Sequence, residues 1–291
     1  MILSTKEINK VRHKAEKPLY ALCVLITVVI VIFAVITVGT GDDDYIKVLI
    51  FGGFESAEES AGEGGEEEED SLLFWIALGP FLLLGLLYYT YALSRADSIR
   101  VTEKNFPEIY HKSVEFAKKL GLKKVPAVYI EQHHGILNAF AAAVIGKNYA
   151  MLNAEIVDIA YMEHKDFDTV FFVLAHEFGH IYLKHATFSY LLMVFIPHLI
   201  PVFGQMHSRS QEYSCDRIAQ ILMERDCAHE AMILSAGRHL YKYVDVEDYL
   251  ATVKKEKGIF LWFVNLMATH PIMKKRIAAL ADPYKKSGKL F

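Results

Sequence analysis

Two long apolar segments constrain this chain more than any other feature of its sequence. Residues 19–38 and residues 72–93 contain no Asp, Glu, Lys or Arg. At a rise of about 1.5 Å per residue, a helix of either length crosses a hydrocarbon core of about 30 Å. Apolar residues make up 53% of the 291 residues, which excludes a disordered chain and an ordinary cytosolic enzyme. We therefore predict an integral, multi-pass membrane protein with transmembrane helices at residues 18–38 and 72–93.

The charges around these segments predict their orientation. Basic residues lie before the first segment and after the second: Lys6, Lys10, Arg12, Lys14, Lys17, Arg95, Arg100 and Lys104. Between the segments there is one basic residue, Lys47, among many acidic ones. Because basic flanks stay in the cytoplasm, residues 1–17 and 94–291 are predicted to be cytoplasmic, and the loop at 39–71 to face outward. Its Glu-rich tract at residues 55–70 is predicted to be disordered.

Charge and cysteine usage exclude two other classes. Apart from the acidic loop the chain is mildly basic, which suits a domain lying against the anionic surface of the lipid bilayer. No basic cluster with interleaved aromatic residues occurs, so we expect no nucleic-acid partner. The cysteines, Cys23, Cys215 and Cys227, form no CxxC pair, so neither a disulfide framework nor a cysteine-rich zinc site is expected.

Residues 94–291 have the pattern of an α+β domain that is mostly helical. Helical periodicity and end signals predict helices at residues 102–120, 166–185, 209–224, 228–241 and 271–281. The second of these begins at an acidic cap, Asp166. Three short apolar segments, at residues 127–131, 138–144 and 149–152, are separated by turn-forming residues and predict a small antiparallel sheet.

The sequence His176-Glu177-Phe178-Gly179-His180 lies within the predicted helix 166–185. Two histidines four residues apart share one face of a helix, so both imidazoles can reach one metal ion. Glu177 then lies beside the ion, where its carboxylate can take a proton from a bound water. Zinc suits two imidazoles and a carboxylate, and it lowers the pKa of such a water to about 7. We therefore expect one Zn²⁺ per chain.

A site of this kind needs a third protein ligand, and there are four candidates: Glu212, His185, His207 and His270. The longer motif HExxHxxGxxH is absent, because its glycine and its last histidine are missing here. Glu212 and Asp216 are four residues apart on the next predicted helix and share a face. We predict that Glu212 binds the metal and that Asp216 orients one of the imidazoles.

HExxH followed by ExxxD is the gluzincin arrangement, and the chain resembles the HtpX-like membrane zinc metalloproteases, relatives of the type I CAAX prenyl proteases. The resemblance rests on these motifs, on the two N-terminal spans, and on three further segments. These are Asn138-Ala139-Phe140, Ser208-Arg209 ahead of Glu212, and Thr269-His270-Pro271 with Arg276-Ile277 beyond. Apart from the acidic loop, the match covers the chain almost to its C-terminus.

The resemblance implies a gluzincin-type protease domain with His176, His180 and Glu212 as ligands and Glu177 as general base. It implies that Asn138, Ala139 and Phe140 belong to an edge strand that aligns the substrate backbone, as strand addition would. It also suggests that His270 stabilises the oxyanion; a structural role for His270 and a plain sheet role for the strand are the alternatives. By the same resemblance, the chain acts on misfolded proteins of a bacterial cell membrane in protein quality control.

Residues 187–206 are a third apolar run, long enough to cross the membrane. A single crossing would separate His180 from Glu212, so one zinc ion could not bind both. Pro197 and Pro201 divide the run into two short arms. We predict either a hairpin dipping into the cytoplasmic leaflet or an apolar flap at the mouth of the site, with core packing as the remaining alternative. Residues 258–268 are predicted to lie on the membrane surface nearby.

These observations predict an integral-membrane zinc endopeptidase that hydrolyses protein or peptide substrates with water activated by zinc and Glu177. One alternative is a CAAX-type prenyl protease, which shares the motifs but has more spans. The other is a non-catalytic zinc-binding scaffold or sensor with the acidic loop as its input. Glu177 argues against the latter, because a structural zinc site has no need of a base.

Overall fold

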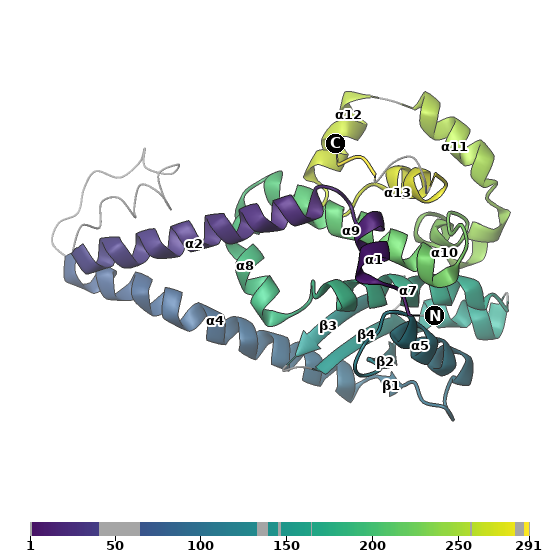
Figure 1. The fold of residues 1–291 in the computed structure, drawn as a ribbon, viewed down its shortest axis with the longest axis horizontal. Helices are drawn as coiled ribbons and strands as arrows, with labels where there is room; N and C mark the ends of the chain where they lie inside the picture. Colours follow the sequence, from purple (N-terminus) through teal and green to yellow (C-terminus); the bar gives the residue numbers. More distant parts are fainter. Residues whose placement is uncertain are drawn as a thin grey trace.

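The computed structural model describes residues 2–40, 65–132, 139–144, 147–163, 165–256, 258–282 and 288–290. Two long helices, α2 (Glu16–Thr40) and α4 (Gly65–Ala96), form an arm that projects from a largely helical body built around one small sheet (Figure 1). The body is otherwise formed by α1 (Thr5–Val11), α5 (Pro107–Lys119), α6 (Ala154–Asp158), α7 (Phe167–Leu183), α8 (Phe188–Leu199), α9 (Phe203–Met223), α10 (Ile233–Leu240), α11 (Val246–Lys255), α12 (Ile259–Met267) and α13 (Met273–Leu280). The mostly helical α+β class is as predicted.

The sheet is mixed, so the predicted antiparallel sheet is wrong. Its strands are β1 (Ile99–Arg100), β2 (Ala127–Glu131), β3 (Ala139–Val144) and β4 (Lys147–Asn153), in the order β1-β2-β4-β3. β3 and β4 form an antiparallel hairpin, but β4 pairs with β2 in parallel. The reason lies in β4, in which residues 149–152 are all buried and so occupy the interior of the sheet. β3 is thereby left at the edge.

Another difference concerns the predicted helix 228–241, which the structure divides. A short 3-10 turn, Glu230–Met232, precedes α10, and a second one, Tyr241–Tyr243, follows it. Gly237 has a φ of 75° and leaves the helical conformation within α10. Glycine adopts this left-handed region without steric cost, so the helix is interrupted there.

Helix α7 occupies the centre of the core. Its buried residues pack against α5, α6 and α9, with Phe116 of α5 in edge-to-face contact with Phe178. The approach to α9 is close, because a Cβ on Gly179 would lie 3.2 Å from the Cα of Cys215. Glycine at position 179 therefore lets the two helices that carry the HExxH and ExxxD motifs lie against each other.

The N-terminus of α7 is capped by Asp166, as the sequence indicates. The carboxylate accepts hydrogen bonds from the Thr169 amide at 3.3 Å and from the Tyr241 hydroxyl at 2.6 Å. We expect Asp166→Ala to lower the free energy of unfolding by about 1–2 kcal/mol, since these two donors and the Thr169 hydroxyl lose their acceptor. Thermal unfolding would show this as a fall in Tm of a few degrees. Asp166→Asn keeps a hydrogen-bond acceptor and is the control. Equal Tm values for the Ala and Asn variants would show that the cap does not stabilise the fold.

The first predicted span is observed as a helix with an apolar, exposed surface. Among the described residues, one helical stretch, Glu16–Ile36, is long and apolar enough to cross a membrane. Helix α4 includes the second predicted span but begins at Gly65, ahead of it, so the last acidic residues of the loop join the helix. Glutamates suit the first turn of a helix because they face its positive end. The second span stays a prediction, and residues 41–64 of the loop lie outside the described residues.

The third apolar run folds as α8 followed by a turn at Pro201 into α9. A Cβ on Gly204 would lie 2.6 Å from the Cα of His198, so glycine permits this sharp reversal. Helix α8 packs on α2, where the Thr27 hydroxyl donates to the Met193 carbonyl at 2.8 Å. In Figure 1, α8 lies between α2 and α4. The run therefore returns, and the residues on either side of it meet in one site.

Candidate metal centre

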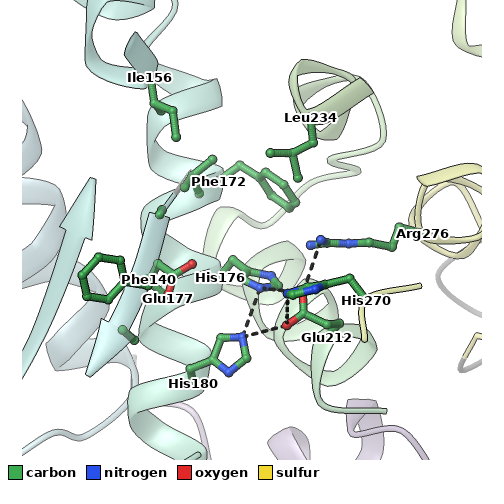
Figure 2. Close-up of a pocket in the computed structure, with 13 residues that line it drawn as sticks. Phe140, Ile156, Phe172, His176, Glu177, His180, Glu212, Leu234, His270 and Arg276 are labelled. Atoms are coloured by element: carbon green, nitrogen blue, oxygen red, sulfur yellow. Dashed lines mark hydrogen bonds and ion pairs between the residues drawn. The ribbon is translucent and has the colours of Figure 1, made fainter. Parts of the chain in front are cut away.

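Helices α7 and α9 bring His176, His180 and Glu212 together around one point (Figure 2). The Nε2 atoms of the two histidines are 3.2 Å apart. The Glu212 carboxylate lies 3.5 Å from Nε2 of His176 and 3.4 Å from Nε2 of His180. All three candidate ligand atoms lie within 4.8 Å of one another. Two imidazoles and one carboxylate form the donor set that zinc prefers, and zinc therefore fits these residues.

Asp216 contacts His176 on the side away from this point. Its Oδ1 lies 2.9 Å from Nδ1 of His176. Because a carboxylate only accepts, the Nδ1 atom carries a proton, and Nε2 is the nitrogen that faces the other candidate ligands. Both side chains are buried, so this contact holds the imidazole in one orientation.

Arg276, within α13, contacts two carboxylates of the site, those of Asp216 and Glu212. It donates to both oxygens of Asp216, from Nε at 2.9 Å and from Nη2 at 2.6 Å. Its Nη1 lies 3.3 Å from Oε2 of Glu212. The sequence motif includes Arg276, but sequence reasoning assigned it no role. A basic residue six positions after His270 carries no signal of burial, although only 7% of this side chain is exposed.

Burial and charge shift the pKa values of the site in opposite directions. Burial raises the pKa of Glu177, which makes the carboxylate a better proton acceptor near neutral pH. Burial alone would lower the pKa of His176, but Asp216 and Glu212 outweigh it and hold that pKa at about 10. A divalent cation must therefore displace a proton from His176, so metal binding should weaken as pH falls.

A cavity of about 260 Å³ opens onto these residues. β3 contributes Ala139, Phe140 and Ala141 to one wall, and Figure 2 shows Glu177 on the side facing Phe140. The rest of the lining is largely apolar: Ile156, Phe172, Val173 and Leu234. Two residues of the predicted edge strand thus lie at the site, while Asn138 lies outside the described residues.

His270 reaches the cavity from the loop between α12 and α13. Its Nε2 lies 3.7 Å from Oε1 of Glu212, and 65% of its side chain is exposed. Arg209 of α9 holds the start of this loop, because it donates hydrogen bonds to the carbonyl oxygens of Leu266 and Ala268 at 2.9 and 2.7 Å. His270 is therefore at the open side of the site, where a substrate would approach.

The other two candidates for the third ligand lie elsewhere. His207 is buried and contacts the Tyr190 hydroxyl at 3.0 Å. His185 contacts the far nitrogen of His180 and could form a second metal group with it and with Cys215. Burial raises the pKa of the Cys215 thiol well above its usual range, which disfavours the thiolate that binds metals. Burial also lowers the pKa of His185 to about 4, against the influence of Glu16, so His185 is neutral at pH 7.

A family model described as Peptidase family M48 matches the chain over residues 103–203 and 189–284. The matched segments contain the three candidate ligands, Glu177, Asp216, His270 and Arg276. Comparisons with curated proteins and with solved structures gave no match.

Proposed function

The chain belongs to peptidase family M48, a family of metallopeptidases, and from this premise we propose that it is an integral-membrane zinc endopeptidase with its active site facing the cytoplasm. One observation carries the proposal. The side chains of His176, His180 and Glu212 converge on one point beside the buried carboxylate of Glu177, and all four residues line a cavity of about 260 Å³.

Each residue of the site has a distinct task in this proposal. A bound zinc ion would supply Lewis acidity to the scissile carbonyl and to a water molecule. Glu177 takes a proton from the attacking water and returns it to the leaving amine. Asp216 keeps His176 in the tautomer that a ligand needs. His270 donates a hydrogen bond to the oxyanion from the open side of the site.

We assign the substrate backbone to the outer side of β3. This strand is last in the order of the described sheet, and Ala139, Phe140 and Ala141 line the cavity. An extended peptide added beside it would bring a peptide bond toward Glu177. Small alanine side chains on the strand leave room for such an approach. Main-chain pairing of this kind recognises many sequences, which fits a protease of misfolded proteins.

Exposed apolar surfaces on α2 and α12 support attachment to the membrane. The exposed surface of α2 is apolar, with Leu25, Val29 and Ile32 among its most exposed residues. Helices α2 and α4 are proposed as the two spans, and α8 as a hairpin arm within the cytoplasmic leaflet. Helix α12 exposes Ile259, Phe260, Trp262, Phe263, Val264 and Met267, and lysines precede it in the chain. Such a helix suits the interface of an anionic membrane.

The orientation and role follow from the same proposal. The basic flanks of the two spans favour a cytoplasmic site. Misfolded proteins of the cell membrane, a bacterial one by family resemblance, are the proposed substrates. Their exposed apolar segments would be concentrated at the membrane surface, where α12 is proposed to lie.

Metal content and cleavage measured together test this function. The chain purified in detergent should contain about one zinc ion and should cleave an unfolded casein. Chelation should remove both the zinc and the activity, and added zinc should restore them. Cleavage that persists without metal would contradict the proposal. Zinc binding without cleavage of casein would favour the two alternatives, a prenyl protease or a scaffold. A prenylated CAAX peptide, tested in parallel, would be cleaved by a prenyl protease and not by a scaffold.

The position of His270 leads to a further prediction. We expect His270→Ala to reduce kcat about 10²- to 10³-fold, the usual cost of losing one oxyanion donor, with zinc content unchanged. His111→Ala is the matched control, because His111 is an exposed histidine outside the cavity. If His270→Ala lost its zinc instead, His270 would be a ligand; if kcat were unchanged, its role would be structural.

A further inference from the structure

The ligand candidate His180 has a partner on the side away from Glu212. Its Nδ1 lies 3.0 Å from Nδ1 of His185. The Nε2 of His185 in turn lies 3.0 Å from Oε1 of Glu16, the first residue of α2. His185 is 6% exposed and Glu16 is fully buried. Two imidazoles and a carboxylate thus form a hydrogen-bonded chain, buried at Glu16 and His185, that ends at the candidate metal position.

The carboxylate determines where the protons of this chain lie. Glu16 can only accept a hydrogen bond, so Nε2 of His185 carries the proton. A neutral imidazole has one donor and one acceptor, so Nδ1 of His185 accepts. His180 must then donate from Nδ1, and its Nε2 lone pair faces His176 and Glu212. This is the tautomer that binding a metal through Nε2 requires.

Glu16 is held in place by further contacts at the junction of α1 and α2. It pairs with Arg12 and accepts a hydrogen bond from the Ser214 hydroxyl of α9. Ser214 also accepts from the backbone amide of His13 at 2.9 Å. Burying a carboxylate is costly unless it is paired and hydrogen-bonded, as it is here. The start of α2 is therefore fixed to the helix that carries Glu212.

We propose that Glu16 and His185 are positioning residues of the metal centre, which fix the orientation and tautomer of His180 and connect the site to the start of the first membrane helix. The inference rests on the proposed function for the ligand set. In this proposal each imidazole ligand is oriented by a carboxylate: Asp216 contacts His176 directly, and Glu16 acts on His180 through His185. A change in the position of α2 relative to α9 would then alter the metal site directly.

Zinc affinity, measured at pH 7 by competition with a chelator, tests the proposal on the full-length chain in detergent. We expect His185→Phe and Glu16→Gln each to weaken zinc binding about 10- to 100-fold, the usual effect of losing a residue that orients a ligand. His185→Gln should recover part of the loss, because its amide oxygen can accept from His180 Nδ1. The cobalt-substituted His185→Phe protein should also show an altered visible spectrum, since the geometry of the ligands changes.

Two controls separate positioning from folding and from the ligand assignment itself. His207→Phe removes another buried histidine of the same region that contacts neither His176, His180 nor Glu212; it should lower Tm without changing zinc affinity. His176→Ala removes a proposed ligand and should abolish tight binding. If His176→Ala loses zinc while His185→Phe and Glu16→Gln keep the wild-type affinity, the positioning proposal is overturned. If His176→Ala keeps zinc, the ligand set fails, and the proposed function with it.

Discussion

Glu177→Gln is expected to reduce peptide hydrolysis by about 10²- to 10⁴-fold and to leave the zinc content at one ion per chain. Glutamine has the shape of glutamate but cannot take a proton from water. Glu177 is buried at the cavity beside His176, His180 and Glu212, but it is not a member of their candidate metal-binding group. The substitution should therefore remove the base while the metal site stays intact.

The environment of Glu177 makes this variant easy to interpret. Burial raises the pKa of Glu177, which means that the charged carboxylate is unfavourable in the folded protein. Replacing it with a neutral amide should therefore not destabilise the fold. Glu230→Gln is a matched control: Glu230 is also a buried glutamate whose pKa is raised by burial, and it lies outside the cavity. The measurements are initial rates of casein cleavage, zinc per chain and Tm. Activity within tenfold of wild type would rule out Glu177 as the base.

The meeting of His176, His180 and Glu212 could be predicted from the sequence because it depends mainly on local geometry. Residues four apart share a helix face whatever the rest of the chain does. One further condition, that α7 and α9 pack together, depends on the return of the apolar run between them and on Gly179 at their contact. The return of the apolar run at Pro201 could be predicted by the same reasoning, since a crossing would separate the motifs.

The strand order and the contacts of Arg276 and Glu16 could not be predicted, because they depend on residues far apart in the chain. An alternating or apolar segment indicates a strand but not its neighbour in the sheet. Here β4 pairs with β2, although β3 lies between them in the sequence. Arg276 is 60 residues from Asp216, and Glu16 is 169 residues from His185. In the sequence, each resembles an ordinary charged residue near a helix end. Only the packed structure shows that both are buried against the site.

Arg276→Met is expected to have the largest effect on stability. Removing one partner of a buried ion pair typically costs about 3–5 kcal/mol, because the remaining charge stays buried without compensation. Here the remaining groups are Asp216 and Glu212, both buried and both paired with Arg276. Methionine fills much of the space but supplies no donor. Thermal unfolding should therefore show a fall in Tm of many degrees, and Arg276→Lys, which keeps the charge without the planar fork, should lie between.

The presence of zinc should change the size of this effect. A bound cation beside Glu212 would replace part of the positive charge that Arg276→Met removes, so the loss of Tm should be smaller with zinc than after chelation. By linkage, zinc would then stabilise the variant more than it stabilises the wild type. Arg209→Met is the matched control, because Arg209 is also buried but donates to the neutral backbone carbonyl oxygens of Leu266 and Ala268. Its loss of Tm should be the same in both conditions. An equal loss with and without zinc for Arg276→Met would show that Arg276 does not share the charge of Glu212 with the metal.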